Sequence, residues 1–279
     1  MSQIQWFPGH MAKGQRLIYQ YKKIVNLYII VVDARAPHSS LHNSFTRYNI
    51  EPKNIILVFS KIDLVDKKEL DKWIYHYKNI FFDVLDLNLL NNNEVNTKLF
   101  KLISNYFSFK KIPNKYIMIL GSPNVGKSTL INSLNMKKKI KVENRPGVTK
   151  GVTWISYKDL FIFDTPGILE PKIDENRIAY NLIFTNSIKW EILQDHYDII
   201  DYLFTFLKNR YPNIFLEYYK LNSEDILKPN HLIIEDLIIK KNMYLKNKEQ
   251  DYERLYKSIF IEVSKGKIGK LIFDFYEKK

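Results

Sequence analysis

Short runs of apolar residues mark the first half of the chain. Three of them, at residues 27–32, 55–59 and 116–120, are uninterrupted, and a fourth at 80–85 is broken only by Asp83. A strand with one solvent face alternates apolar and polar residues, whereas a strand covered on both faces does not. The pattern therefore predicts strands of a parallel sheet that is covered on both sides.

Segments with helical spacing lie between these runs. Residues 66–77 begin with an acidic residue and carry apolar side chains three and four positions apart, and residues 95–106 repeat that spacing. Strands that alternate with helices are typical of a doubly wound α/β fold. Residues 155–157 and 160–163 predict an antiparallel hairpin at the edge of its sheet.

The pattern changes after the hairpin. Longer amphipathic stretches follow at residues 195–209, 230–241 and 251–262, with few strand signals. We therefore expect two domains. An α/β domain covers residues 1–172, and a smaller, mostly helical domain covers residues 173–279.

Composition narrows the class of protein. The chain has 279 residues, of which 46% are hydrophobic, so it can bury a substantial core. It has no cysteine, which excludes disulfides and thiolate zinc sites and suits a reducing compartment. There is no apolar run of membrane-spanning length and no apolar segment typical of a signal peptide. A cytoplasmic protein without membrane partners is the expectation.

Positive charge is distributed unevenly along the chain. The formal net charge is +13; residues 1–167 hold 25 Lys and Arg against 12 Asp and Glu, while residues 168–279 hold 18 of each. Within the second part, residues 240–279 hold 11 basic and 6 acidic residues, a net of +5. Such an excess suits a polyanionic partner such as nucleic acid, although it also serves solubility.

The strongest chemical signal is GSPNVGKST at residues 121–129, which fits the phosphate-loop pattern Gly-x4-Gly-Lys-Ser/Thr. It follows an apolar strand and precedes a helical segment, as that motif requires. Backbone amides at a helix N-terminus bind phosphate, Lys127 reaches the β and γ phosphates, and the Ser128 hydroxyl can ligate Mg²⁺. The other residues expected to contact nucleotide here are Asn124, Val125, Gly126 and Thr129.

Two further motifs complete a triphosphate site. DTPG at residues 164–167 ends an apolar strand, so Asp164 is expected to hold Mg²⁺ through water and Gly167 to offer its amide to the γ phosphate. RPGVT at 145–149 lies between this motif and the phosphate loop. Its Thr149 is expected to close on Mg²⁺ and the γ phosphate when a triphosphate is bound.

A base-recognition motif precedes all of these. SKID, residues 60–63, is similar to the Asn-Lys-x-Asp motif that selects guanine. The Asp63 carboxylate can accept hydrogen bonds from two guanine nitrogens, which adenine cannot offer, and the stem of Lys61 can stack on the base. Ser60 replaces the usual asparagine, and its shorter side chain is expected to lose contacts to the base and the phosphate loop. A second loop that backs the base is expected at Asn88 and Leu89.

The order of the motifs is unusual. In an ordinary GTPase the base-recognition motif comes last, whereas here 60–63 precede 121–129, 145–149 and 164–167. Joining the usual chain ends and opening the chain elsewhere gives this order with the same site. The permutation places only residues 168–172 between the phosphate-sensing segments and the helical domain, so nucleotide state could move that domain.

With these motifs the chain resembles the circularly permuted GTPases of the ribosome biogenesis GTPase A family. The resemblance covers nearly the whole chain and includes WFPGHMAKG at 6–14, VDARAP at 32–37, SKID, GSPNVGKSTLIN at 121–132, RPGVT and DTPGILEPK at 164–172. It implies a GTPase that assists a late step in large-subunit assembly. It also implies that the helical domain binds ribosomal RNA in the GTP state, that release follows hydrolysis, and that the subunit stimulates a slow intrinsic activity. The basic residues 240–279, including KGKIGK at 265–270, would form the RNA contact.

His10 is the candidate catalytic residue. Many GTPases orient the attacking water with a glutamine where this chain has Ile168, so a polar group must come from elsewhere. The family resemblance implies that role for His10, which we expect just after a turn in the N-terminal segment 1–25. Alternatively, Trp6, Phe7 and His10 dock the N-terminus or contact RNA.

Three residues and two functional alternatives stay open. Asn124 can ligate a potassium ion beside the phosphates, as in related GTPases, or can stabilise its loop. Asp33 and Arg35 end the first strand near the expected site, without an assigned role. One alternative to a GTPase switch is an RNA-binding scaffold whose nucleotide site is structural or weakly active, which the departure at Ser60 suggests. Another is an ATPase, in which Asp63 would be incidental.

Overall fold

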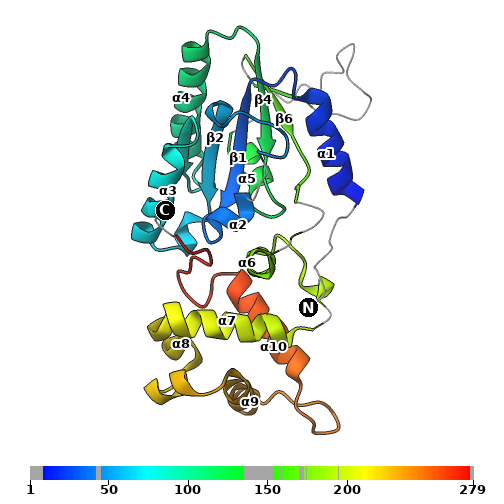
Figure 1. Ribbon diagram of the computed structural model, residues 1–279, viewed down its shortest axis with the longest axis vertical. Coiled ribbons are helices and arrows are strands. Elements are labelled where there is room, and N and C mark those ends of the chain that lie inside the picture. The colour runs from blue at the N-terminus through cyan, green and yellow to red at the C-terminus, as the bar shows by residue number, and fades with distance from the viewer. Residues whose placement is uncertain are drawn as a thin grey trace. The chain divides into compact units, whose positions relative to one another are not determined.

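The structure is a computed structural model that describes residues 9–41, 45–134, 154–157, 159–169, 173, 175–193 and 195–276. The chain forms two compact units (Figure 1). The first, here called the α/β unit, contains Met1–Ser187 and the returning segment Ile272–Lys279. The second, the helical unit, contains Ile188–Leu271.

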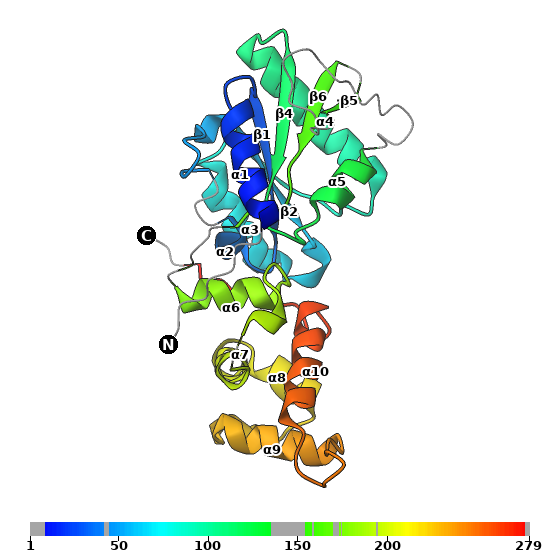
Figure 2. The same ribbon diagram turned by 90° about the vertical axis from the view of Figure 1, so that its right-hand side faces the viewer.

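A six-stranded sheet forms the centre of the α/β unit, with strand order β3-β2-β1-β4-β6-β5. The strands are β1 (Leu27–Asp33), β2 (Ile55–Ser60), β3 (Asp83–Asp86), β4 (Lys115–Leu120), β5 (Trp154–Tyr157) and β6 (Leu160–Asp164). All pairings are parallel except that of β5 with β6, which lie side by side at one edge (Figure 2). The predicted α/β fold class and its edge hairpin are confirmed.

The third strand begins later than the apolar run predicted. Ile80 and Phe81 each donate a backbone hydrogen bond to the Tyr77 carbonyl, at 3.0 and 2.9 Å. These bonds close the end of the preceding helix, so only Asp83–Asp86 remain to pair with β2. Local turn bonds therefore outweigh the strand preference of Ile80 and Phe81.

Helices cover both faces of the sheet. Those of the α/β unit are α1 (Gly9–Tyr21), α2 (Pro37–Leu41), α3 (Lys67–Lys78), α4 (Asn92–Lys110), α5 (Lys127–Ser133) and α6 (Asn176–Phe184), with short 3-10 turns at Pro52–Asn54 and Ile62–Leu64. Alternate strand residues pack against opposite layers, as strand geometry requires. One core joins Ile30 and Val32 to α1 and α3, and the other joins Ile29 and Val31 to α4 and α5.

Parallel pairing brings four strand ends to one edge of the sheet. Asp33 pairs with Ser60 at the ends of β1 and β2, and β4 lies beside both β1 and β6. Ligands bind outside the carboxyl ends of the strands in such folds. The topology therefore brings SKID, the phosphate loop and DTPG together at the carboxyl ends of these strands.

The helical unit contains α7 (Tyr197–Arg210), α8 (Pro212–Tyr219), α9 (Asn230–Lys240) and α10 (Tyr252–Ser264), with 3-10 turns at Trp190–Ile192 and Ser223–Leu227. Three of these helices lie where the amphipathic stretches predicted them. Phe204 and Phe215 are fully buried, with ring centroids 5.1 Å apart. None of the described helices is both long enough and apolar enough to cross a membrane.

The division between the units lies after Ser187 rather than after residue 172. Helix α6 belongs to the α/β unit because the Asn181 amide donates to Asp274 at 2.9 Å and to Ser39 at 3.2 Å. Asp274 comes from the returning segment, which also belongs to this unit. The whole of α6 was expected in the helical domain, so the expected boundaries and the compact units differ here.

Candidate nucleotide-binding site

The phosphate loop connects β4 to α5 in the expected strand–loop–helix order. Gly126 caps the N-terminus of α5 with φ +103°, a backbone conformation that side chains with a Cβ rarely adopt. The loop therefore turns sharply into the helix, and the first amides of α5 point out of its N-terminus. Within this segment, Val125 is fully buried, whereas Ser128 is exposed.

Lys127 lies buried inside this loop. Its Nζ donates hydrogen bonds to the carbonyl oxygens of Gly121 and Ser122, at 2.8 and 2.7 Å. Burial lowers the pKa of Lys127 to about 8, and the nearby Asp164 carboxylate only partly offsets that effect. The ammonium group is thus held within the loop by weak neutral acceptors, which an anionic ligand could replace.

Asp164 ends β6 and faces the same loop. Burial raises the pKa of this carboxyl, and Lys127 acts in the opposite direction. Its Oδ1 atom is buried and makes no hydrogen bond with any described residue. A buried carboxylate oxygen without a partner is costly, so this atom fits a position that a hydrated cation completes.

The DTPG turn packs directly on the phosphate loop. Thr165 donates its hydroxyl to the Ile119 carbonyl at 2.7 Å, and the Ile168 amide donates to the Gly121 carbonyl at 3.2 Å. A Cβ atom at Gly167 would lie 2.8 Å from the Pro123 backbone, so only glycine fits there. The predicted γ-phosphate residue therefore adjoins the phosphate loop.

One cavity of about 750 Å³ brings these groups together. Of the predicted site residues it is lined by Asn124, Gly126, Lys127, Ser128, Thr129, Asp164 and Gly167. Helix α1 contributes Leu17 to the same wall. The cavity thus combines the phosphate loop, the predicted magnesium residues Ser128 and Asp164, and the N-terminal helix.

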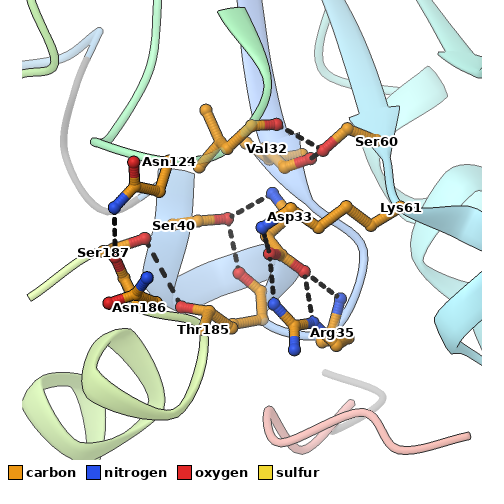
Figure 3. Close-up of polar contacts among 12 residues, drawn as sticks. Val32, Asp33, Arg35, Ser40, Ser60, Lys61, Asn124, Thr185, Asn186 and Ser187 are labelled. Carbon is orange, nitrogen blue, oxygen red and sulfur yellow. Dashed lines mark hydrogen bonds and ion pairs between the residues drawn. The ribbon is translucent and has the colours of Figure 1, made fainter. Parts of the chain in front are cut away.

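Ser60 corrects one expectation from the sequence. It is fully buried, and its Oγ lies 2.6 Å from the Val125 carbonyl oxygen and 3.0 Å from that of Val32 (Figure 3). The hydroxyl therefore keeps the contact to the phosphate loop that the shorter side chain was expected to lose. The reason is that the loop approaches closely enough for a serine to reach it.

The base-recognition residues follow β2. Lys61 has a left-handed backbone (φ 53°, ψ 37°), and Asp63 is exposed in the 3-10 turn Ile62–Leu64. The predicted second loop lies beside the phosphate loop: Leu89 is buried, and its Cδ1 is 3.0 Å from where a Cβ of Gly126 would be. Asn88 is exposed and accepts a hydrogen bond from the Leu90 amide at 3.1 Å.

Asp33 and Arg35 form a buried ion pair that sequence reasoning did not assign. Arg35 donates from Nε to Oδ1 at 3.0 Å and from Nη2 to Oδ2 at 2.9 Å, and Lys61 Nζ lies 2.7 Å from Oδ2 (Figure 3). Burial alone would raise the pKa of Asp33, but the two cations hold it well below its usual range. The available signal was an aspartate ending the strand beside the base-recognition strand.

Asn124 makes a contact outside its own loop. Its side-chain amide donates to the Asn186 carbonyl at 2.7 Å, at the end of the segment that follows α6 (Figure 3). This bond supports a role in stabilising the loop. The potassium role stays a prediction.

The N-terminal helix differs from expectation in one respect. Helix α1 begins at Gly9, so the helix already includes Gly9, which was expected in the turn, and His10, which was expected just after it. The side chain of His10, and Trp6 and Phe7, lie outside the described residues, as do Thr149 and the rest of RPGVT.

Gly14 places α1 against the DTPG turn. A Cβ at this position would lie 3.0 Å from Ile168 Cγ1 and 3.6 Å from Pro166 Cβ. His10 lies four residues earlier, and residues four apart share one face of a helix.

This sheet topology and this cavity, with the base-recognition motif ahead of the phosphate loop in the chain, define a circularly permuted phosphate-loop GTPase domain. A protein family described as "50S ribosome-binding GTPase" matches residues 116–225, which begin at the strand before the phosphate loop. The chain belongs to the ribosome biogenesis GTPase A family. It is 33% identical to ribosome biogenesis GTPase A of Priestia megaterium over 97% of this chain and 96% of the relative.

A second relative and a solved structure are also similar to nearly the whole chain. Ribosome biogenesis GTPase A of Bacillus cereus is 35% identical over 97% of this chain and 93% of its own length. The solved structure of GNP-bound YlqF from T. maritima is 28% identical, with a TM-score of 0.64 over 94% of this chain and 97% of that chain.

Proposed function

We propose that this chain binds and hydrolyses GTP as an assembly factor for the large ribosomal subunit. Family membership supports the biological role. The observation that carries the chemistry is the cavity in which Lys127, Ser128 and the unpartnered Asp164 oxygen face one another. Phosphate complements Lys127 and the amides at the α5 N-terminus, and a divalent cation complements Ser128 and Asp164.

Each residue of the cavity then has a role in phosphate binding. Lys127 exchanges its two carbonyl partners for oxygens of the β and γ phosphates. Ser128 directly, and Asp164 through water, would hold Mg²⁺, with Thr149 completing the set. The ion would neutralise charge on the phosphates during transfer. Gly167 offers its amide to the γ phosphate.

The SKID segment supplies guanine specificity in this proposal. Asp63 accepts from the guanine ring nitrogen and the exocyclic amine, while the stem of Lys61 and the Asn88–Leu89 loop flank the base. Competition of unlabelled GTP and ATP against labelled GDP tests the choice of base directly. Equal competition by ATP would favour the ATPase alternative. Asp63→Asn should lose GTP affinity and gain affinity for XTP, which offers an acceptor in place of the amine.

His10 is proposed to orient the attacking water. Ile168 cannot do so, and α1 presents Gly14, on the same helical face as His10, to Ile168. An imidazole can accept a proton from water or stabilise phosphoryl charge. His10→Ala should reduce turnover at least about a hundredfold while leaving GTP affinity unchanged. Unchanged turnover would leave His10 as a docking or RNA-contact residue.

Potassium is proposed to act through Asn124. In that role its side-chain oxygen faces a cation beside the phosphates. Turnover in potassium should then exceed turnover in sodium at equal ionic strength, and Asn124→Ala should abolish the difference. Equal rates in the two salts would restrict Asn124 to its bond with Asn186.

The ribosomal role is tested by turnover with and without purified large subunits. We expect slow turnover alone and a large rise with the subunit, because the partner would fix the N-terminal segment. RNA binding is assigned to residues 240–279 and should be strongest with a non-hydrolysable GTP analogue and weakest with GDP. No rise in turnover, with GTP still bound, would favour the scaffold alternative.

A further inference from the structure

The buried acid Asp33 has no part in the function proposed above. It ends β1, is fully buried, and uses both carboxylate oxygens in ion pairs. A buried charge must be paired, and Arg35, itself 2% exposed, already provides one full counter-charge. The second cation, Lys61, is therefore not needed for neutrality.

Lys61 is held in a conformation that it would not adopt freely. Its backbone is left-handed, which disfavours residues with a Cβ, and its side chain is 28% exposed, so water could solvate its ammonium group. The Nζ atom instead lies 2.7 Å from Asp33 Oδ2. The ion pair with a buried carboxylate therefore fixes where the Lys61 side chain lies.

Asp33 is fixed by its own loop. Its backbone amide donates to Ser40 Oγ at 3.1 Å, and the Arg35 amide donates to Asp33 Oδ1 at 3.0 Å. The Ser40 carbonyl in turn accepts from Ser122 Oγ, in the phosphate loop, at 2.9 Å. The group that holds Lys61 is thus fixed by its own loop, and Ser122 joins the same loop to the phosphate-binding segment.

We propose that Asp33 is a positioning residue for nucleotide binding, which holds Lys61 where its stem stacks on the base. The proposal rests on the proposed binding of guanine nucleotides. Because Asp33 acts through Lys61 on the base, its effect is the same for GTP and GDP and does not reach the transferred phosphate.

The first test is the Asp33→Asn variant. Its affinity for GDP and for a non-hydrolysable GTP analogue should fall equally, by roughly tenfold or more, because a charge-assisted contact is lost. The KM for GTP should rise by the same factor while kcat is kept. Tyr106→Phe is the matched control: it removes a hydroxyl that bonds Asn26 and Asn54 at 2.6 and 3.0 Å in the same unit, away from the cavity.

A purely structural role for Asp33 gives a different result. Both variants would then melt at lower temperature, and both would keep full GDP affinity in the folded protein. That outcome would overturn the proposal. Ser40→Ala is a milder variant for the case in which Asp33→Asn does not fold, because it loosens the Asp33 amide but keeps the ion pairs. A smaller loss of affinity is expected from it, and unchanged affinity counts against the proposal.

The second test needs no nucleotide. Acylation of lysines by an N-hydroxysuccinimide ester, followed by peptide mass spectrometry, measures the accessibility of Lys61 against the exposed Lys68 as reference. Asp33→Asn should raise the relative rate at Lys61 severalfold, and an unchanged rate would show that Asp33 does not hold it. If the unchanged protein bound no guanine nucleotide, the proposed function would fail, while this rate would still decide whether Asp33 positions Lys61.

Discussion

Burial determines the chemistry of Lys127. The side chain is 7% exposed, and its pKa is lowered to about 8 because the folded loop disfavours the charged form. Phosphate groups would raise that pKa again, since they are negatively charged. Between the two pKa values the complex holds a proton that the free protein lacks, so binding takes up a proton in that range.

Affinity for GDP should therefore decrease as the pH rises above 8, by up to about tenfold per pH unit. Titration calorimetry at pH 7, 8 and 9, in buffers of different ionisation enthalpy, measures both the affinity and the proton uptake. Lys127→Met serves as the control, because any residual binding should lack the pH dependence. Constant affinity from pH 7 to 9 would contradict the lowered pKa of Lys127 in the free protein.

Ser60 shows what a motif reveals about a residue and what it does not. The SKID pattern identified the base-recognition segment, but the contact of Ser60 with Val125 joins positions that are 65 residues apart. Only the folded sheet brings them together. The same holds for Asp33 and Lys61, whose pairing depends on the neighbouring ends of β1 and β2.

Substitution of Ser60 should show whether the serine is a fitted contact to the phosphate loop or a weakened form of the asparagine motif. Ser60→Ala removes the contact with the phosphate loop and should lower GDP affinity about fivefold, the equivalent of roughly 1 kcal/mol. Ser60→Asn must fit a larger side chain at a fully buried position, so its melting temperature should fall. A tighter-binding, equally stable Ser60→Asn variant would show instead that the serine is a weakened motif.

At the scale of elements, those with an apolar run or a clear period were predictable, and the short helix α2 was not. The continuous apolar runs located β1, β2 and β4, and Asp66 marks the start of α3, where its side chain accepts from two backbone amides. The short helix α2 was not predicted, because its five residues show no period and are held by tertiary bonds such as that of Ser39 with Asp274. Local sequence cannot report such bonds.

Helix α1 offers a prediction at this scale. Gly14→Ala adds a methyl group 3.0 Å from Ile168 Cγ1, so the Ile168 side chain or the helix must shift by a few tenths of an ångström. If His10 orients water, turnover should decrease about tenfold at unchanged GTP affinity, since small displacements of a catalytic group are costly. The exposed Arg16→Ala on the same helix is the control for stopped-flow binding and phosphate release. Full activity of Gly14→Ala would show that the position of α1 does not affect catalysis.

At the scale of the whole molecule, the division into units could not be seen in composition. The change of pattern after the hairpin suggested a boundary at residue 172, yet α6 and the returning segment belong with the sheet. What joins them is a buried cluster around Asp274, which is 4% exposed and accepts hydrogen bonds from Ser39 and Asn181. Three segments that are distant in sequence meet there, and the sequence of each segment does not predict its contact with the other two.

The returning segment should therefore be required for a stable α/β unit. Asp274→Ala leaves the Ser39 amide and hydroxyl and the Asn181 amide without their acceptor, at a cost of about 3 kcal/mol in the free energy of unfolding. A chain ending at Leu271 also loses Ile272, which is fully buried in the core shared with α1 and α3, and should be less stable still. Urea denaturation measures both effects.

Hydrogen exchange locates the same effect. Amides of α2 and α6 should lose protection in Asp274→Ala, whereas those of β2 and β3 should keep theirs, because their bonds do not involve the returning segment. A chain ending at Tyr276 keeps Ile272 and Asp274 and is the matched control for shortening. If the chain ending at Leu271 were as stable as this control, the returning segment would add nothing to the stability of the α/β unit, which would be complete at Ser187.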